Sequence, residues 1–260
     1  MEPTVKIKVH DQAGTIILNR PDKRNALSRD LLTNLQQAFE DLHLEKRVRA
    51  VILTGAGAAF SSGMDLAEML ATSLEDDPHP RWHEDAALYR DVLETMLQFP
   101  KPIIAAVGGP ALAGGAGLAL ASDIVIAAED ATFGLPEPRR GLVAGIVSPL
   151  LAFRIGGGMA ANLLLTARTI DAREAHRIGL AHEVVPGDKI WARSVEIANQ
   201  CALCAPEALQ LTKRMLNETI GEQLATLLTA GAAVSATART TEAAAEGLAA
   251  FLEKRDPKWR

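Results

Sequence analysis

The sequence predicts an α/β fold with a mainly parallel sheet. Three short apolar segments, residues 50–53, 103–107 and 124–127, have the length and composition of buried strands. Segments with a helical spacing of apolar residues separate them, and strands that alternate with helices form right-handed β-α-β crossovers in a parallel sheet. Pro100 and Pro102 frame the second strand, so we expect the preceding helix to end before them.

The N-terminal part is expected to form a hairpin, a helix and a strand, in that order. TVKIKVH alternates apolar and polar residues, DQAG is typical of a turn, and TIILNR continues as a second strand. Ser28 is a residue type that caps helices. The apolar residues after it recur at helical spacing, namely Leu31, Leu32, Leu35, Ala38, Phe39 and Leu42. Residues 48–55 then form a short buried strand.

Two later regions differ from this pattern. Residues 71–88 are polar and interrupted by proline, which predicts a mobile loop. From about residue 187 the chain is helical, with segments before Cys201, from Pro206 to Asn217 and, rich in alanine, from Gly221 to Lys254. A terminal helical layer more often builds a subunit interface than a pocket. We therefore expect a core over residues 1–200 and a helical oligomerisation region over residues 201–260.

Composition excludes several classes of function. A chain of 260 residues with 48% hydrophobic and 23% charged residues is an ordinary globular protein. Its net charge of -5 argues against a nucleic-acid-binding surface, because basic groups provide most of that affinity. No apolar run has the roughly 18 to 20 residues of a membrane-spanning helix. The N-terminal MEPTVKIKVHD resembles neither a signal peptide nor a transit peptide, which predicts a cytoplasmic protein.

The residues that commonly bind metals do not form a predicted site. The two cysteines lie in CALC, Cys201 and Cys204, with no second ligand pair nearby, and we expect both to face the core from a helix. His79 and His83 are four residues apart, but Pro80 lies between them and no third ligand is evident. No metal site is therefore expected.

The segment ALAGGAGLALASDIVIA, residues 111–127, points to an anion or oxyanion site. Gly114 and Gly115 follow an apolar strand and open a helix. Free backbone N–H groups at a helix N-terminus favour negative charge, and glycine lets a ligand approach the backbone closely. Such a position suits either a phosphate or an oxyanion that forms during a reaction.

Three other interpretations of glycine-rich sequence fail. The dinucleotide fingerprint needs a third glycine where Leu120 stands. A P-loop needs a lysine, and none occurs between Lys101 and Lys189. Ser61 and Ser62 lack the flanking glycines of a nucleophile elbow. The oxyanion interpretation remains.

Two more segments complete a predicted active site. LTGAGAAFSSGMDLAEM, residues 53–69, is a second strand exit whose backbone can supply another oxyanion donor. In ATFGLPEPRRGLVAG, residues 131–145, Glu137 lies among apolar residues, and an apolar pocket raises a carboxyl pKa toward neutrality, which suits proton transfer. A surface glutamate paired with Arg139 or Arg140 is the alternative.

Four segments, in this order and spacing, resemble the crotonase family, the enoyl-CoA hydratase/isomerase superfamily. They are NRPDKRNALS, AFSSGMDLAEM, ALAGGAGLALASDIVIA and FGLPEPRRGL. The resemblance implies an α/β fold with a spiral core of ββα turns and a C-terminal helical trimerisation region, in a homotrimer or a dimer of trimers. It also implies an acyl-CoA thioester as substrate, with CoA as part of the substrate and no metal or redox cofactor.

The resemblance assigns roles by motif. The catalytic group is Glu137, and the backbone N–H groups of Ser62 and Gly114 hold the thioester oxygen. The remaining predicted site residues, which contact CoA or line the pocket, are Lys23, Arg24, Ala26, Gly63, Met64, Asp65, Leu66 and Gly145.

One departure from the family pattern bears on the reaction. Hydratases of the family carry one glutamate at the position of Gly117 and another at that of Glu137, and the pair activates water. This chain keeps only Glu137, as the double-bond isomerases do. Hydration would need another group, or a water held by Glu137 and the N–H of Gly145.

Two further functions stay open at this point. GMDL followed by FGL-x-E also resembles the hydratase-lyases of hydroxycinnamoyl thioesters, in which a hydroxyl group recognises a phenol. The only tyrosine, Tyr89, either approaches the pocket mouth or packs in the core. Val147, Ser148 and Pro149 replace the GGTQ-like run of common hydratases. The third possibility is a catalytically silent acyl-CoA-binding protein.

Overall fold

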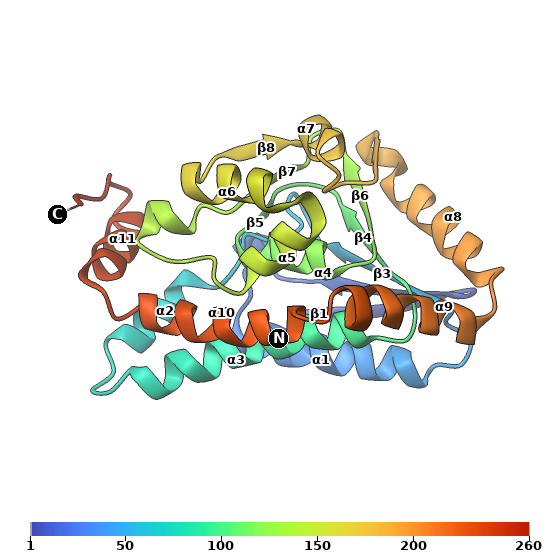
Figure 1. The fold of residues 1–260 in the computed structure, drawn as a ribbon, viewed down its shortest axis with the longest axis horizontal. Helices are drawn as coiled ribbons and strands as arrows, with labels where there is room; N and C mark the ends of the chain where they lie inside the picture. The colour runs from blue at the N-terminus through green and yellow to red at the C-terminus, as the bar shows by residue number, and fades with distance from the viewer. Residues whose placement is uncertain (1, 260) are drawn as a thin grey trace.

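A six-stranded sheet forms the centre of the molecule (Figure 1). The structure is a computed structural model that describes residues 2–259. The strand order is β1-β2-β3-β4-β6-β9; β1 is antiparallel to β2 and all other neighbours are parallel. The strands are β1 (Val5–His10), β2 (Ala13–Leu18), β3 (Ala50–Gly55), β4 (Ile103–Val107), β6 (Ile124–Ala128) and β9 (Glu183–Val185). The predicted α/β class is confirmed.

A smaller three-stranded sheet turns the chain into a spiral. Its strands are β5 (Ala111–Leu112), β7 (Thr132–Gly134) and β8 (Thr169–Asp171). Strand β4 is followed by β5 and then by helix α4 (Gly114–Ala121); β6 is followed by β7 and the 3-10 helix η2 (Glu137–Arg140). After β3, Ser61 makes a single bridge to Ala111 before α2 begins. Each turn of chain thus passes from the large sheet to the small one and into a helix.

The predicted N-terminal elements are confirmed. Strands β1 and β2 form the hairpin, and the 3-10 helix η1 (Pro21–Lys23) follows. The Ser28 side chain accepts a hydrogen bond from the Leu31 N–H, 3.2 Å, at the start of α1 (Arg29–Leu44). All six apolar residues predicted for the inner face of this helix are buried.

The prediction of a mobile loop over residues 71–88 is wrong. Helix α2 (Leu66–Ser73) covers its start and α3 (His79–Gln98) covers its end. Pro78 caps α3 and Pro80 lies in its first turn, where the missing N–H of proline has no helical partner to lose. Trp82 is buried, and the Asp85 carboxylate is neutralised by Arg29. Proline therefore starts a helix here instead of breaking one.

Helices α5 to α7 surround the small sheet and the buried helix α4. They are α5 (Val147–Ile155), α6 (Gly157–Thr166) and α7 (Ala172–Arg177). Every residue of α4 is buried, and the helix packs against α3, α5 and β4. The N-terminus of α4 therefore has a fixed place between the two sheets and α3.

The C-terminal part consists of helices, as predicted, with one break. After η3 (Gly187–Lys189) come α8 (Ile190–Ala202), α9 (Pro206–Arg214), a π-helical turn η4 (Met215–Ile220), α10 (Leu224–Ala238) and α11 (Glu242–Leu252). The alanine-rich helix is interrupted after Ala238, and Thr241 caps α11 through the Ala244 N–H at 3.1 Å. Cys201 is half-buried in α8, but Cys204 is exposed beyond its end, so the expectation that both face the core is wrong.

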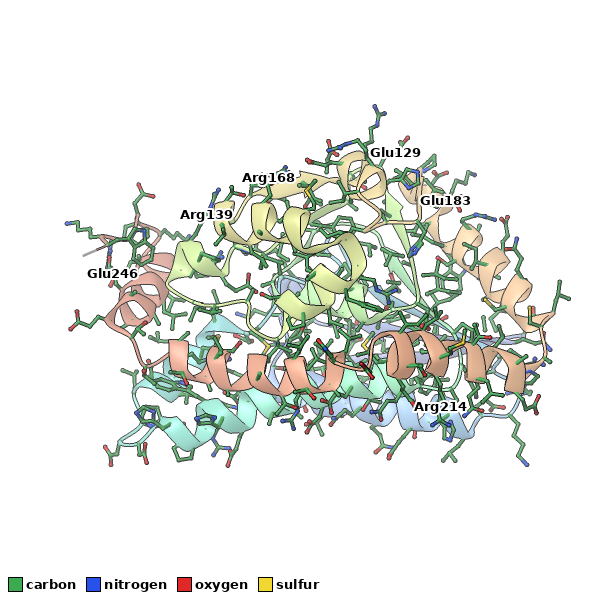
Figure 2. The ribbon with its side chains drawn as sticks, in the orientation of Figure 1. Glu129, Arg139, Arg168, Glu183, Arg214 and Glu246 are labelled. Atoms are coloured by element: carbon green, nitrogen blue, oxygen red, sulfur yellow. The ribbon has the colours of Figure 1, made fainter. Side chains whose placement is uncertain are left out.

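Charged groups lie mainly on the outside, but a few ion pairs are buried, and one of them lies beneath the C-terminal helices. The side chains of Glu129, Arg214 and Glu246 project outward (Figure 2). Lys213 of α9, in contrast, is buried, and its Nζ lies 2.7 Å from Asp123 Oδ2. Asp123 also accepts the Ile103 N–H at 2.7 Å, so this pair joins α9 to the start of β4.

The last helix closes the molecule over η2. Helix α10 packs along α3, and α11 packs against η2 and α2. A Cβ atom at Gly247 would lie 2.7 Å from Arg140 Cα, and one at Gly141 would lie 2.7 Å from the Ala244 N atom. Because these distances are below van der Waals contact, the two backbones can meet only through glycine.

Among residues 2–259, every helix is either too short or too polar to span a bilayer.

Candidate active site

A cavity of about 350 Å³ lies where the strand exits, α3 and the last two helices meet. Its walls come from residues 23–26, the loop after β3, helix α3, the β5-α4 junction, residues 136–147, α10 and α11. Of the predicted site residues, all but Gly63 line it: Lys23, Arg24, Ala26, Ser62, Met64, Asp65, Leu66, Gly114, Glu137 and Gly145. The structure therefore gathers the predicted residues from four separate segments into one site.

Asn25 organises the loop that follows β3. Its buried side-chain amide donates to the carbonyl groups of Ala56, Ala59 and Phe60, and the Ser61 hydroxyl donates to the Asn25 carbonyl at 2.9 Å. Asn25 adopts a left-handed conformation with φ of 53°, which asparagine tolerates better than most residues. Sequence reasoning missed this residue; a single asparagine within an exposed, charged segment gave no sign of burial.

Ser62 is not positioned as the predicted oxyanion donor. Its N–H already donates to the Arg24 carbonyl at 2.9 Å. The loop forms a parallel bridge with Leu27, through Leu27 N to Gly63 O and Asp65 N to Leu27 O. In such a bridge the N–H of the intervening residue, Met64, points away from the partner. Within residues 2–259 the Met64 N–H has no hydrogen-bond acceptor.

Gly114, the other predicted donor, is the first residue of α4. Ala113 has an unusual φ of 52° that turns the chain from β5 into the helix. The Gly114 N–H has no acceptor among the described residues. A Cβ at Gly63 would lie 3.1 Å from the Gly114 N atom, so the two loops are in close contact. Met64 and Gly114 thus line one cavity from two adjacent loops.

Glu137 carries a buried carboxyl group without an ion-pair partner. It is the first residue of η2, and its Oε2 atom is buried and has no hydrogen-bond partner among residues 2–259. Burial raises its pKa to about 7, although a hydrogen bond from its own N–H and the charge of Arg140 oppose the shift. The alternative of a surface glutamate paired with Arg139 or Arg140 is not observed.

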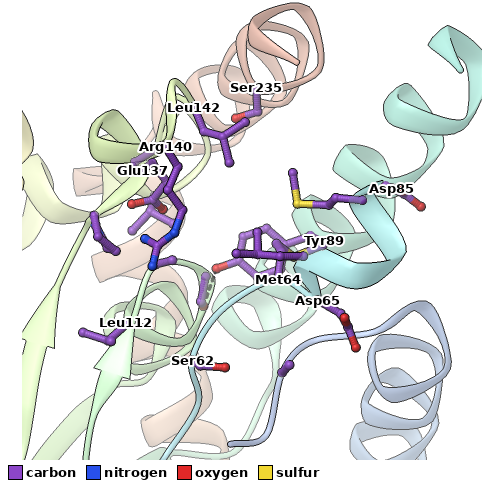
Figure 3. Close-up of a pocket in the computed structure, with 18 of the residues that line it drawn as sticks. Ser62, Met64, Asp65, Asp85, Tyr89, Leu112, Glu137, Arg140, Leu142 and Ser235 are labelled. Atoms are coloured by element: carbon purple, nitrogen blue, oxygen red, sulfur yellow. Dashed lines mark hydrogen bonds between the residues drawn. The ribbon is translucent and has the colours of Figure 1, made fainter. Parts of the chain in front are cut away.

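The other two cavity-lining carboxylates are already neutralised. Asp65 lies 2.9 Å from Arg20 Nη1, and Asp85 lies 2.6 Å and 2.9 Å from two nitrogens of Arg29. Figure 3 shows both carboxyl groups directed away from Tyr89 and Glu137. Glu137 is therefore the one carboxyl among the described cavity-lining residues that is free to exchange a proton with a substrate.

The Tyr89 side chain lines the cavity itself and does not lie only near its entrance. Its hydroxyl donates to the Gly114 carbonyl at 2.6 Å, and the side chain is buried. Burial, with the nearby Glu137 charge, raises its pKa well above the usual value, so the phenol is neutral at physiological pH. Figure 3 shows the hydroxyl directed toward the side of the pocket that carries Glu137 and Arg140.

Two arginines add positive charge to the cavity wall. Arg140 lies over the Phe251 ring, with 4.4 Å from Cζ to the ring centroid, and its Nε is buried without a hydrogen-bond partner in the described chain. Arg239, the residue that ends α10, has a buried side chain, and its Nη1 lies 3.8 Å from Asp85 Oδ2. Sequence reasoning missed Arg239, which follows an alanine-rich segment far along the chain from Asp85.

Metal-ligating side chains do not cluster near the cavity. Residues 2–259 contain no group of three or more His, Cys, Asp and Glu side chains placed to hold a metal ion. His79 begins α3, and its ring packs edge-on against Trp82, with 5.4 Å between the centroids.

Comparison with known proteins places this architecture in a family. The family model for enoyl-CoA hydratase/isomerase matches residues 10–260. A relative from Thermus thermophilus, whose name assigns it provisionally to the enoyl-CoA hydratases, is 41% identical over 246 residues, which are 95% of this chain and 96% of that one.

Solved structures share the fold along nearly the whole chain. An enoyl-CoA hydratase/isomerase from Xanthobacter autotrophicus superposes with a TM-score of 0.88 at 33% identity and covers 97% of both chains. A monofunctional enoyl-CoA isomerase from Mycobacterium smegmatis superposes with a TM-score of 0.72 at 32% identity, over 85% of this chain and 95% of that one. Relatives named for hydration and for isomerisation thus both match.

Proposed function

Because this chain belongs to the enoyl-CoA hydratase/isomerase family, we propose that it is an enoyl-CoA isomerase in which Glu137 alone moves the proton. The observation that carries the proposal is the state of the three cavity-lining carboxyl groups. Asp65 and Asp85 are held in ion pairs, whereas the Glu137 carboxyl has a buried, unpaired Oε2 atom and a pKa of about 7. One carboxyl group can move a proton between two carbons, but activating water in this family uses two.

The backbone N–H groups of Met64 and Gly114 are the proposed oxyanion donors. Met64 replaces Ser62 in this role, because the Ser62 N–H is bonded to Arg24. Two donors aimed at the thioester oxygen stabilise the enolate that forms when a proton leaves the α-carbon. Losing one such donor typically lowers the rate by about 100- to 1,000-fold.

The proposed reaction moves a double bond toward the thioester. Ionised Glu137 removes a proton from C2 of a 3-enoyl thioester, and the resulting dienolate is held by the two N–H groups. The now protonated Glu137 returns that proton to C4, which leaves the double bond between C2 and C3. A pKa near neutrality suits both steps, since the same group must accept and then release the proton.

The CoA portion of the substrate is proposed to lie along Lys23, Arg24 and Ala26. Both basic side chains are exposed at the edge of the cavity, where they can meet phosphate groups, and Ala26 is buried beneath them. The proposed chemistry uses only the thioester, Glu137 and backbone N–H groups. It assigns no step to a metal or redox cofactor.

Hydration of 2-enoyl thioesters is the second candidate. The name of the Thermus thermophilus relative favours it. In this protein it would require a water held by Glu137 and the Gly145 N–H, and both residues line the cavity. Neither the hydroxycinnamoyl-CoA hydratase-lyase nor a catalytically silent acyl-CoA-binding protein is favoured by a specific contact.

The test compares two thioesters with the purified protein. We expect 3-hexenoyl-CoA to be converted to the conjugated 2-enoyl isomer of unchanged mass, and crotonyl-CoA to gain no water. Glu137→Gln should abolish the conversion while still binding the thioester. A product from crotonyl-CoA that is heavier by one water would establish the hydratase, and full activity of Glu137→Gln would remove Glu137 from the mechanism.

We also propose that the protein is a homo-oligomer, a trimer or a dimer of trimers. Large apolar side chains are exposed on the C-terminal helices, including Met215, Ile220 and Val234. Exposed apolar groups gathered on one set of elements are typical of a protein interface. Light scattering coupled to gel filtration tests this: a mass of three or six chains is expected, and a single 27.7 kDa species would contradict it.

A further inference from the structure

We propose that Tyr89 determines reaction specificity by filling the space from which a second catalytic side chain, at position 117, would enter the site. This inference rests on the proposed isomerase function. Tyr89 has no role in the proton transfer proposed for Glu137. Its position accounts for the glycine at position 117, because a larger residue there would meet the Tyr89 side chain.

The geometry at Gly117 is the first support. A Cβ atom added there would overlap the Tyr89 hydroxyl oxygen, and would lie 3.3 Å from Tyr89 Cζ and 2.9 Å from Val147 Cγ2. Gly117 lies within the fully buried helix α4, so its own backbone has no room to move aside. The tyrosine hydroxyl therefore stands where any side chain at position 117 would begin.

The second support is that Tyr89 is fixed in this place. Its hydroxyl donates to the Gly114 carbonyl at 2.6 Å, within the same first turn of α4 that carries Gly117. One turn earlier on the same face of α3, Asp85 accepts two hydrogen bonds from Arg29. The ion pair holds the helix and the hydroxyl bond holds the ring, so the phenol is a rigid part of the wall.

A phenol in this place does not substitute for a carboxylate. Its only proton is donated to Gly114, and burial raises its pKa well above the usual value, so it stays neutral. A neutral hydroxyl is too weak a base to activate water at neutral pH. Tyr89 therefore excludes a second base without replacing it, and Glu137 is left to move protons between carbons.

The prediction is that positions 89 and 117 are coupled. Gly117→Glu alone forces a side chain into occupied space, so we expect it to lower isomerisation of 3-hexenoyl-CoA at least tenfold without adding hydration. In Tyr89→Phe/Gly117→Glu the overlapping hydroxyl is gone, and of the three nearest atoms only the end of the Val147 side chain still lies within 3.0 Å of the new Cβ. We expect the double variant to hydrate crotonyl-CoA at least tenfold faster than either single variant, measured as incorporation of labelled water.

A matched control separates this effect from general loosening of the core. Val92 lies one turn further along α3, is fully buried and does not line the cavity. Val92→Ala/Gly117→Glu also removes buried atoms from α3, but Val92 is not among the residues nearest a Cβ at position 117. We expect no gain of hydration in this variant. An equal gain in the control, or full hydration by Gly117→Glu alone, would overturn the role of Tyr89.

A second measurement does not depend on activity. Gly117→Ala adds only the overlapping Cβ, so we expect its melting temperature to fall by about 5 °C or more. Tyr89→Phe/Gly117→Ala should recover at least half of that fall, and Val92→Ala/Gly117→Ala should recover none. Strictly additive shifts would show that the hydroxyl does not occupy the space.

The outcomes also separate this inference from the proposed function. If the unaltered protein isomerises no 3-enoyl thioester, the proposed function fails, while the melting temperatures still report whether Tyr89 fills the site. If it hydrates crotonyl-CoA rapidly with Tyr89 in place, the inference fails whatever the melting temperatures show.

Discussion

Arg20 and Asp65 are joined by a hydrogen bond of 2.9 Å that ties together two walls of the cavity. The same Arg20 nitrogen donates to the Ala26 carbonyl at 2.6 Å, and both ends of the ion pair are largely shielded from solvent. Arg20 therefore sets the position of the loop carrying Met64 relative to the segment carrying Lys23 and Arg24, although it is not among the cavity-lining residues.

Removing this guanidinium should misplace the proposed oxyanion donor. We expect Arg20→Ala to lower kcat/KM for a 3-enoyl thioester by about 100-fold, since displacements of about 1 Å have effects of that size. Arg47→Ala, which removes an exposed arginine paired with Glu45, is the control and should leave kcat/KM unchanged. Equal rates for the two variants would show that the loop holds its position without Arg20.

The pKa of Glu137 should set the pH dependence of the proposed reaction. Because the first step needs the ionised carboxylate, kcat/KM should rise with pH through an apparent pKa of about 7 and then level off. Glu137→Gln should lower kcat/KM by about 1,000-fold and remove this dependence. A wild-type profile with its midpoint near 4.5 would mean that the carboxyl group is hydrated in the working enzyme.

The same buried carboxyl group should reduce stability as the pH rises. Its pKa is about 7 in the folded protein and 4.5 in an unfolded chain. Below pH 4.5 the carboxyl group is protonated in both states and does not oppose folding. Between pH 4.5 and 7 only the unfolded chain ionises, so the free energy of unfolding falls. The full loss is about 3 kcal/mol. Urea unfolding should show Glu137→Gln gaining up to that amount over the wild type at pH 8 relative to pH 5. A constant difference between the two proteins would contradict the raised pKa.

The Lys213–Asp123 pair should stabilise the fold without affecting catalysis. Lys213→Ala leaves a partly buried carboxylate without its partner, and we expect the free energy of unfolding to fall by about 3 kcal/mol. The neighbouring Arg214, whose ion pair with Glu218 is exposed, provides a matched control, and Arg214→Ala should change stability by less than about 0.5 kcal/mol. Similar losses for both variants would contradict this assignment.

The fold could be predicted where local patterns dominate. The hairpin, the Ser28 cap and the three parallel strands follow from residue spacing over fewer than 20 residues, and all are confirmed. The α2–α3 segment was missed because Pro78 and Pro80 were interpreted as breakers. Whether proline ends or begins a helix depends on what the following turns pack against. In α3, Asp85 forms an ion pair with Arg29 and Trp82 is buried in the core.

In the candidate site, too, features set by local sequence could be predicted and features set by distant contacts could not. Glu137 and Gly114 could be singled out because each lies in a distinctive local context, and both line the cavity. Whether the N–H of Ser62 or that of Met64 is free depends on the β-bridge to Leu27, which lies some 35 residues earlier in the chain. The placement of Tyr89 over Gly117 joins two helices, and a sequence pattern in either helix does not reveal it.

The close contact between η2 and α11 also decides which part of the chain encloses the site. Arg140 and Gly141 meet the backbone of residues 243–247, and Phe251 and Leu252 form part of the cavity wall. The strands, α4 and Glu137 are therefore not enough to enclose the site. A chain in which α11 has detached would keep these elements but would open this wall of the cavity to water.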